Sequence, residues 1–449
     1  MKHTLWGSAF TKNPSSEVLS FTAGRDVKSL PACDEALIPY DIMVNKVHCS
    51  MLEKQSIISH EDAQKLLTAL SDLEALWRKG EFLLDPEKED VHTNIENWLT
   101  EKLGIEIAGK IHTARSRNDQ VATDMKLYTK EMAQVFIDEL SSLVDSLQKL
   151  SITHSKTIMP GFTHHQHAMV TTYGELLKSF SVMLQRDCQK FSAWNEIHDE
   201  SPLGSMAGYG TSFPIDKKYT ASELGFNSAF KSSIDTVTNR GESETDLAYS
   251  IVSMMNHFSH IAQTFIILST PQFGFIRLAD NFSTGSSVMP QKKNPDPLEV
   301  IKAKAAYASG QLQSLIAIGQ ANFLGYNRDS QWSKYIIMDL IRECIPTPQI
   351  LQELIESTET HAEQMEQWCH RNFIGATTLM EQLCKSYKIP MRVAKIIVEK
   401  AIKNSENKHK IDYNTLINAC NEHHISCPVT KEEVMKWQDP HWLSDLKTT

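Results

Sequence analysis

Residues 110–159 read KIHTARSRNDQVATDMKLYTKEMAQVFIDELSSLVDSLQKLSITHSKTIM and contain neither glycine nor proline. Within this stretch apolar residues recur every three to four positions, as at Phe136, Leu140, Leu143 and Leu147. Apolar spacing of this kind, without helix breakers, is typical of a long amphipathic helix. The stretch therefore predicts one helix that runs through most of these residues.

Two further stretches, 175–201 and 242–270, show the same spacing and also lack glycine and proline. Helices of about 30 residues are ~45 Å long, too long to be buried by one compact domain, so they must pack along one another and against copies from other subunits. Strand signals are weak, because residues 162–173 hold some β-branched residues but no alternating apolar runs recur. We therefore predict an all-α fold with a central bundle of long helices.

The positions of proline and glycine along the chain predict three domains. Residues 1–112 mix helical stretches with breaker-rich loops and are expected to form an N-terminal domain. The long helices of residues 113–362 form the central bundle, in which Pro346 and Pro348 interrupt the last helical region. Residues 363–449, rich in Lys, Glu and His, are expected to form a small helical C-terminal domain.

Composition excludes several classes of protein. The chain carries 45 basic and 55 acidic residues, a net charge of −10, which argues against a nucleic-acid-binding protein. No apolar run approaches the ~20 residues of a membrane span, and no secretory signal opens the chain. The 8 cysteines contain no C-x-x-C pair, so we expect reduced thiols in a cytoplasmic protein.

Residues 109–120 place two arginines and an asparagine, Arg115, Arg117 and Asn118, at the expected start of the first long helix. Cationic side chains beside the N–H groups of a helix N-terminus favour a carboxylate or a phosphate. An ordinary capped helix start in contact with solvent explains the same residues, so this segment alone leaves both interpretations open.

Residues 159–167 contain three histidines, His164, His165 and His167. They lack the i, i+4 spacing of helical metal ligands and have no cysteine or carboxylate beside them, which argues against a metal site. One positioned imidazole suits proton transfer at neutral pH, but exposed surface histidines are the simpler interpretation of this segment alone.

Residues 284–296, TGSSVMPQKKNPD, join two expected helices. Glycine, serine and proline make such a segment mobile, and its lysines and backbone N–H groups suit an anion on which the loop closes. No phosphate-binding loop or dinucleotide fingerprint occurs in the chain, so no nucleotide cofactor is expected.

Together these segments resemble the fumarase/aspartase superfamily. The loop at residues 285–295 is similar to the signature loop of that superfamily, and residues 114–120 and 289–296 resemble argininosuccinate lyases and the related delta-crystallins in particular. Further similarity lies at residues 90–93, 160–164 and 326–334, and the resemblance extends from about Leu5 to about Lys395.

The resemblance implies a homotetramer of three-domain, all-α subunits whose central helices form a shared bundle. Each active site would be built from three motif segments supplied by three different subunits. The implied reaction is the reversible β-elimination of argininosuccinate to arginine and fumarate, with no metal and no organic cofactor.

The resemblance also implies roles for individual residues. Ser286 is the expected base, Lys292 the cation that stabilises its alkoxide, His164 the group that transfers a proton at the leaving nitrogen, and Glu299 the carboxylate that orients His164. Which of Ser286 and His164 makes each proton transfer stays open. The expected substrate contacts are Asn118, Thr163, Asn294, Tyr326, Gln331 and Lys334, with Arg117 and Arg240 as carboxylate partners.

Several positions depart from the family pattern. Ala9 replaces an arginine, Gly24 replaces a serine that contacts substrate, and Met169 and Val170 replace Gln-Pro; Thr378 stands where aspartate is usual, and the Gly-Gly-Thr tail is missing. These differences leave two alternatives: a sister lyase that releases a different amine from a succinyl adduct, and a non-catalytic relative of the delta-crystallin kind.

Overall fold

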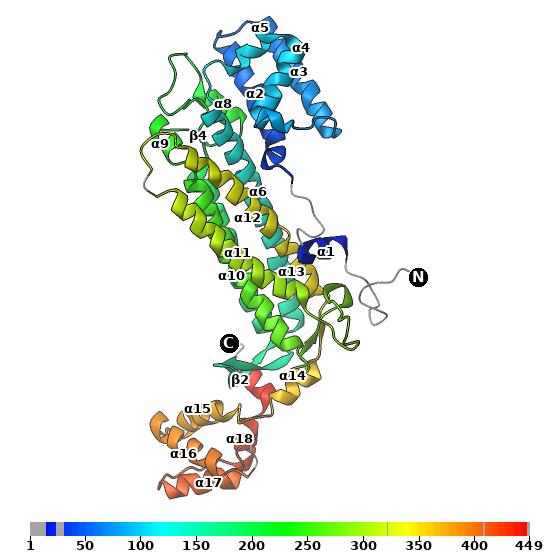
Figure 1. Ribbon diagram of the computed structural model, residues 1–449. Coiled ribbons are helices and arrows are strands. Elements are labelled where there is room, and N and C mark those ends of the chain that lie inside the picture. The colour runs from blue at the N-terminus through cyan, green and yellow to red at the C-terminus, as the bar shows by residue number, and fades with distance from the viewer. Residues whose placement is uncertain (1–14, 24–30, 321, 407–408, 447–449) are drawn as a thin grey trace.

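The computed structural model describes residues 15–23, 31–320, 322–406 and 409–446. The departures at Ala9 and Gly24 and the last three residues lie outside these ranges. The subunit is elongated and mostly helical, with the N-terminal helices at one end, which we call the upper end, and the C-terminal helices beyond the other (Figure 1). The all-α prediction is confirmed, and strands are confined to three short pairs in the described ranges.

Four long helices form the bundle: α6 (Arg117–Thr153), α7 (Tyr173–His198), α10 (Glu242–Ser269) and α11 (Asp296–Ile318). The first three coincide with the three stretches without glycine or proline. Helices α6 and α7 pack along each other, as do α10 and α11, and α10 also packs on α7 (Figure 1). The periodic apolar residues face inward; Phe136, for example, is fully buried and stacks on Phe191 at 5.1 Å between ring centroids.

The upper end carries the N-terminal helices α2 (Ile38–Lys54), α3 (His60–Arg78), α4 (Val91–Leu103) and α5 (Ile105–Ala108). Helix α1 (Ser16–Ala23) lies lower, against α11 (Figure 1). Between α7 and α10, the chain forms α8 (Lys217–Glu223), α9 (Ser233–Thr238) and a short parallel pair of β3 (Glu200–Ser201) with β4 (Ser228–Ala229).

After α11 the chain forms α12 (Trp332–Cys344) and α13 (Thr347–Glu356). The break between them falls at Pro346, with Pro348 in the first turn of α13, as the sequence predicts. One continuous hydrophobic core connects the N-terminal helices with the bundle.

At the lower end, β1 (Ile158–Thr163) and β2 (Gln166–Thr172) form an antiparallel hairpin. This hairpin covers most of residues 162–173, where strand signals were weak. Pro160 and Gly161 lie inside β1, and a bulge between Pro160 and Phe162 interrupts the pairing, so the residue pattern does not alternate as in a regular strand.

The last part of the chain holds α14 (Ala362–Trp368), α15 (Ala376–Tyr387), α16 (Met391–Asn404), α17 (Tyr413–Glu422), α18 (Lys431–Lys436) and α19 (Pro440–Asp445). β5 (Ile276–Arg277) pairs with β6 (Glu359–Thr360) just before α14. The helices from α15 to α18 enclose a second hydrophobic core of their own, separate from that of the bundle. Thr378, one of the departures from the family pattern, is buried in α15.

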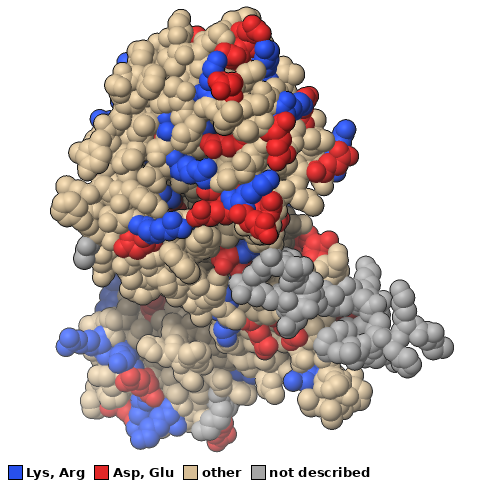
Figure 2. All heavy atoms as spheres, turned by 45° about the horizontal axis from the view of Figure 1, so that its top comes forward, with Lys and Arg blue, Asp and Glu red and all other residues tan. Residues whose placement is uncertain are grey.

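Charges of both signs alternate over the N-terminal helices on the face that Figure 2 shows, and the coloured residues form no continuous basic area there. In the part of the chain that the structure describes, none of the helices combines the length and the apolar character needed to cross a membrane.

Candidate active site

The first group of predicted site residues lies where α6 begins. Ser116 caps this helix: its side chain accepts a hydrogen bond from the Asn118 N–H, and Asp119 completes a capping box by accepting from the Ser116 N–H. The positive end of the helix dipole therefore lies beside Asn118. Asp119 is fully buried and also accepts from the N–H groups of Gly204 and Met206, so one carboxylate joins the helix start to the segment after β3.

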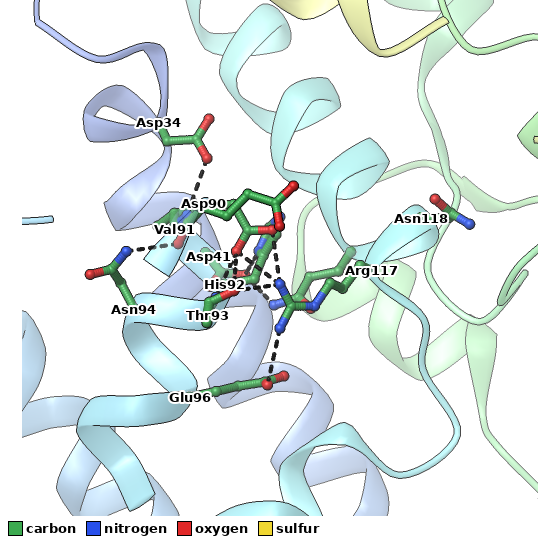
Figure 3. A network of polar contacts seen from close by, with 12 residues as sticks. Asp34, Asp41, Asp90, Val91, His92, Thr93, Asn94, Glu96, Arg117 and Asn118 are labelled. Carbon is green, nitrogen blue, oxygen red and sulfur yellow. Dashed lines mark hydrogen bonds and ion pairs between the residues drawn. The ribbon is translucent and has the colours of Figure 1, made fainter. Parts of the chain in front are cut away.

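Arg117 is held by the protein's own carboxylates. Its Nη1 donates to Asp90 at 2.9 Å and to the Thr93 hydroxyl at 2.5 Å, and Nη2 donates to Glu96 at 3.5 Å. In Figure 3 the guanidinium points toward Asp90 and Glu96, whereas Asn118 points the other way. In this chain Arg117 thus fixes the start of α4 to α6, and a substrate contact by Arg117 stays a prediction.

Lys334 joins the same region from α12. Its ammonium donates to Asp34 at 2.5 Å, and the other oxygen of Asp34 accepts from the Val91 N–H at 3.1 Å. Both Lys334 and Asp34 are buried. Asp34 was missed at the sequence level because it lies in a short 3-10 helix, Cys33–Leu37, between Pro31 and Pro39, where a single acidic residue carries no distinctive signal.

Arg240, Tyr326 and Gln331 complete the upper group. The Arg240 guanidinium lies over the Tyr326 ring, 5.4 Å from its centroid, and the Tyr326 hydroxyl lies 3.5 Å from Gln331 Oε1. Arg240 and Lys334 line a small cavity of about 30 Å³, together with Ala122 one helical turn after Asn118. A larger hollow of about 220 Å³ shares Lys126, Thr236, Asn239 and Ser243 with it.

A buried acidic cluster lies among the helices at the upper end of the bundle. Asp41 on α2, His92 on α4 and Asp124 on α6 bring their ligand atoms within 4.8 Å of one another, and His92 Nδ1 lies 3.1 Å from Asp41. Burial and the Asp41 carboxylate raise the pKa of Asp124 well above its ordinary value. His92 and the Arg115 guanidinium lower the pKa of Asp41 although burial opposes them.

The pKa values of the two carboxyl groups, Asp41 and Asp124, are thus shifted in opposite directions, and Asp124 is the one whose neutral form burial favours. The cluster links three helices, α2, α4 and α6, and the Arg115 guanidinium is close enough to lower the pKa of Asp41. There was little indication of this cluster in the sequence. Asp124 lies near the start of α6 among other polar residues, such as Gln120 and Thr123, and these are buried as well.

The second group lies at the tip of the β1–β2 hairpin. Thr163 pairs with Gln166, so His164 and His165 form a two-residue turn. Their φ angles are 51° and 60°, and positive φ at both central residues is the signature of a type I′ turn, whose twist suits a hairpin. Thr163, His164 and His165 are all exposed in the single subunit.

The third group lies in the loop between α10 and α11. Thr284 and Asn294 close this loop with two backbone hydrogen bonds, of 3.0 and 2.8 Å. Inside it, the Ser286 oxygen accepts from the N–H groups of Val288 at 3.3 Å and Met289 at 3.0 Å. Two N–H donors on a hydroxyl oxygen stabilise its deprotonated form, which is what a serine base requires.

Lys292 and Glu299 are both exposed, and neither side chain makes a hydrogen bond or an ion pair with another described residue. Lys292 lies in the same loop as Ser286, and its ammonium is not engaged by another described side chain. The expected contact between Glu299 and His164 does not form within one chain. Asn294 donates to the Gly285 carbonyl at 3.4 Å and so braces the loop from inside.

The three groups lie apart in one subunit. The start of α6 is at the upper end of the bundle, whereas the hairpin and the beginning of α11 are at the lower end (Figure 1). Helix α6 has 37 residues, so Asn118 and His164 are separated by roughly 55 Å of helix. No hydrogen bond or ion pair between described residues joins the Ser286 loop to the tip of the hairpin.

Comparison with known proteins identifies the family to which this chain belongs. A family model described as lyase matches residues 30–310, more than half of the chain. An argininosuccinate lyase of Leuconostoc mesenteroides is 38% identical over 89% of this chain and 85% of its own length, and one of Campylobacter jejuni is 36% identical over 90% and 87%. The chain belongs to the argininosuccinate lyase family.

Solved structures agree on the fold. EDDS lyase in complex with formate superposes with a TM-score of 0.84 at 22% identity, covering 96% of this chain and 86% of that one. A class II fumarase of Schistosoma mansoni gives 0.74 at 16% identity, covering 98% and 96%. The prediction of a fumarase/aspartase-like architecture is confirmed, as is the resemblance to argininosuccinate lyases.

Proposed function

We propose that this chain catalyses the reversible β-elimination of argininosuccinate to arginine and fumarate. The observation that carries this proposal is the identity of 35–38% to argininosuccinate lyases over about nine-tenths of the chain. The arrangement of Ser286 supports it, because a serine oxygen with two N–H donors in a lysine-bearing loop suits abstraction of a carbon-bound proton.

In the proposed mechanism, the Ser286 alkoxide removes the proton from the carbon next to a substrate carboxylate. The negative charge that develops on this carboxylate is stabilised by Asn294 and by backbone N–H groups of the loop, while Lys292 stabilises the Ser286 alkoxide. His164, oriented by Glu299, gives a proton to the leaving nitrogen as the carbon–nitrogen bond breaks. Asn118, Thr163, Arg240, Tyr326, Gln331 and Lys334 bind the remainder of the substrate.

We propose further that the active enzyme is a homotetramer whose sites combine segments from three subunits. Two observations support this assembly. The start of α6 lies at the opposite end of the bundle from the hairpin and the Ser286 loop, too far to meet them within one chain (Figure 1). The long helices also keep large apolar side chains exposed on their outer faces, namely Val182 and Ile197 on α7, Tyr249 on α10 and Ile316 on α11. Such residues are typical of interfaces between helices of neighbouring subunits.

The division into domains at residues 1–112, 113–362 and 363–449 is also a proposal. The separate core of the helices α15 to α18 supports the last boundary. The cytoplasmic location expected from the sequence stays a prediction.

The test is direct. Purified protein incubated with argininosuccinate should release fumarate and arginine in equal amounts, measured by absorbance and by amino-acid analysis. The Ser286→Ala variant purified in the same way is the control for contaminating lyase. Failure to release fumarate, or release of fumarate only from a different succinyl amine, contradicts the proposal and supports the non-catalytic or the sister-lyase alternative, respectively.

A further inference from the structure

The outer part of the β1–β2 hairpin carries His164, and few pairs within the hairpin itself hold this part in place. The inner pairs, from Ile158 with Thr172 to Pro160 with Val170, lie before the bulge. Ile158 and Val170 are buried in a small core that they share with residues of the C-terminal segment. Beyond the bulge two residue pairs remain before the turn. Because two-stranded hairpins are marginally stable by themselves, this outer part needs packing from elsewhere in the subunit.

The pair of Phe162 with His167 provides this packing. Directly opposed residues of an antiparallel hairpin project from the same face, and these two rings meet edge to face with 5.3 Å between their centroids. The His167 ring also lies 5.4 Å from the Trp368 ring of α14, and the Phe162 ring lies 5.6 Å from that of Phe273, which precedes β5. Burial lowers the pKa of His167, so at neutral pH its ring is uncharged and packs as an aromatic group.

Trp368 is the centre of the aromatic cluster that these rings join. Its ring stacks on that of Phe273 at 4.9 Å and meets that of Phe275 edge to face at 5.2 Å, and Phe275 is fully buried. Helix α14 is itself tied to the segment before β5. The Gln364 amide donates to the Phe273 carbonyl at 3.2 Å, and the His361 N–H donates to the Phe275 carbonyl at 2.9 Å. The outer hairpin thus rests on a fixed support within the same subunit.

We propose that His167 and Trp368 are positioning residues, which hold the outer hairpin so that the His164 imidazole stays where it transfers its proton. This inference rests on the proposed function, in which His164 acts on the leaving nitrogen. Phe162 lies two residues before His164 and His167 three residues after it, so the turn is held on both sides. A displacement of about 1 Å can cost a reaction about 100-fold in rate, so loss of this support should lower turnover more than it lowers stability.

The experiment compares the full-length wild type with His167→Ala, His167→Phe and a matched control, His154→Ala. His154 is also half-buried and meets the Tyr173 ring edge to face at 5.1 Å, but it lies where the hairpin leaves the helices α6 and α7. We expect His167→Ala to lower kcat for argininosuccinate at least tenfold. His167→Phe, which keeps an aromatic ring, should retain more than half of the wild-type kcat, and His154→Ala should leave it unchanged. Trp368→Phe should likewise be more active than Trp368→Ala.

Hydrogen–deuterium exchange provides a second readout, which does not depend on activity. Peptides that cover residues 158–172 should exchange faster in His167→Ala than in the wild type, while the remainder of the chain exchanges at the wild-type rate. A wild type that releases no fumarate from argininosuccinate overturns the proposed function, and the catalytic part of this proposal with it. An active wild type whose His167→Ala variant loses less than tenfold in kcat overturns the positioning role alone.

Subunit mixing separates a positioning role from a general loss of stability. If His167 acts through His164, then His167→Ala subunits should match His164→Asn subunits in the activity they recover when reassembled with Ser286→Ala subunits. A mixture of His167→Ala with His164→Asn should gain nothing above the mean of the two proteins measured separately. A gain in that mixture overturns the proposal, as does exchange that rises throughout the chain, or a His167→Phe variant that loses as much kcat as His167→Ala.

Discussion

The hydrogen bonds around Ser286 are directed at its oxygen. The Val288 and Met289 N–H groups both donate to it, and its own hydrogen has no assigned acceptor among the described residues. A side chain held in this way is arranged to lose its proton. It makes little contribution to the packing of the subunit, since the neighbouring residues 287–293 are all exposed.

We therefore predict that Ser286→Ala reduces turnover of argininosuccinate more than tenfold while the melting temperature stays within the range expected for a change of ~0.5 kcal/mol or less. Ser287→Ala, one position further along the loop, is the matched control and should keep both properties. A Ser286→Ala enzyme with more than about a tenth of the wild-type rate would remove Ser286 from the mechanism.

Asp119 gives a prediction on pH. Burial raises the pKa of Asp119 to about 6, although three backbone N–H groups favour its charged form. The folded pKa thus lies above the unfolded value, so the contribution to stability is complete below the unfolded pKa and is lost as the pH rises through about 6. The stability advantage of the wild type over Asp119→Asn should shrink by up to about 3 kcal/mol between pH 4 and pH 7.5.

The measurement is the difference in melting temperature between wild type and Asp119→Asn, taken at both pH values so that titration of all other groups cancels. A difference that is constant with pH, or larger at pH 7.5, contradicts the assignment.

At the residue scale the sequence allowed candidate reactive groups to be named, and their roles stay predictions, but it did not indicate the groups that hold them. Ser286, Lys292 and Asn294 do lie in one loop, and Arg240, Tyr326, Gln331 and Lys334 do gather around one end of the bundle. Asp34 and Asp124, which fix Lys334 and the buried cluster, could not be found, because an isolated acidic residue acquires its role only through neighbours from distant parts of the chain.

At the scale of elements, the β1–β2 hairpin sets the conformation of His164. Positive φ at both turn residues restricts which side chains fit there, and asparagine is among those that tolerate this region. His164→Asn should therefore abolish turnover without lowering the melting temperature. His165→Asn, the adjacent position with the same backbone conformation, should keep both. Equal loss of activity in the two variants would show that the turn, and not His164 itself, is what catalysis requires.

The junction of α6 and α7 gives a second prediction at this scale. A Cβ at Gly174 would lie 2.8 Å from the His154 carbonyl carbon and closer still to the Ser151 carbonyl oxygen, and both of these atoms belong to the backbone. Gly174→Ala should thus destabilise the subunit by about 1–3 kcal/mol, seen as a lower melting temperature. Gly109→Ala, where the added Cβ makes an ordinary contact of 3.6 Å with Ile105, should be neutral or slightly stabilising. Equal melting temperatures of the two variants would contradict the close approach.

The long helices were predictable because apolar periodicity and the lack of breakers act over 20 to 40 residues and reinforce each other. The hairpin was not, since Pro160, Gly161 and a bulge interrupt its short strands, and its pairing depends on the turn at His164 and His165.

At the scale of the whole molecule, the proposed tetramer makes a quantitative prediction. Subunits carrying His164→Asn and subunits carrying Ser286→Ala are each inactive, but a site that takes its histidine and its serine from different chains escapes both lesions. Dissociated and reassembled in equal amounts, the two should recover roughly a quarter of the wild-type activity. Mixtures that stay inactive, although mass spectrometry shows hybrid tetramers, would mean that the two residues come from the same chain.

The distance between the α6 start and the hairpin also bears on how the rate depends on dilution. Under the proposed assembly, a solitary chain contains each part of the active site but no complete copy of it. Below the concentration at which subunits separate, specific activity should collapse, so that halving the amount of protein costs more than half of the rate. In a cell, activity would then depend on how far the concentration of subunits exceeds this threshold. A modest fall in synthesis of the chain would lower the total activity by a larger factor than it lowers the amount of protein.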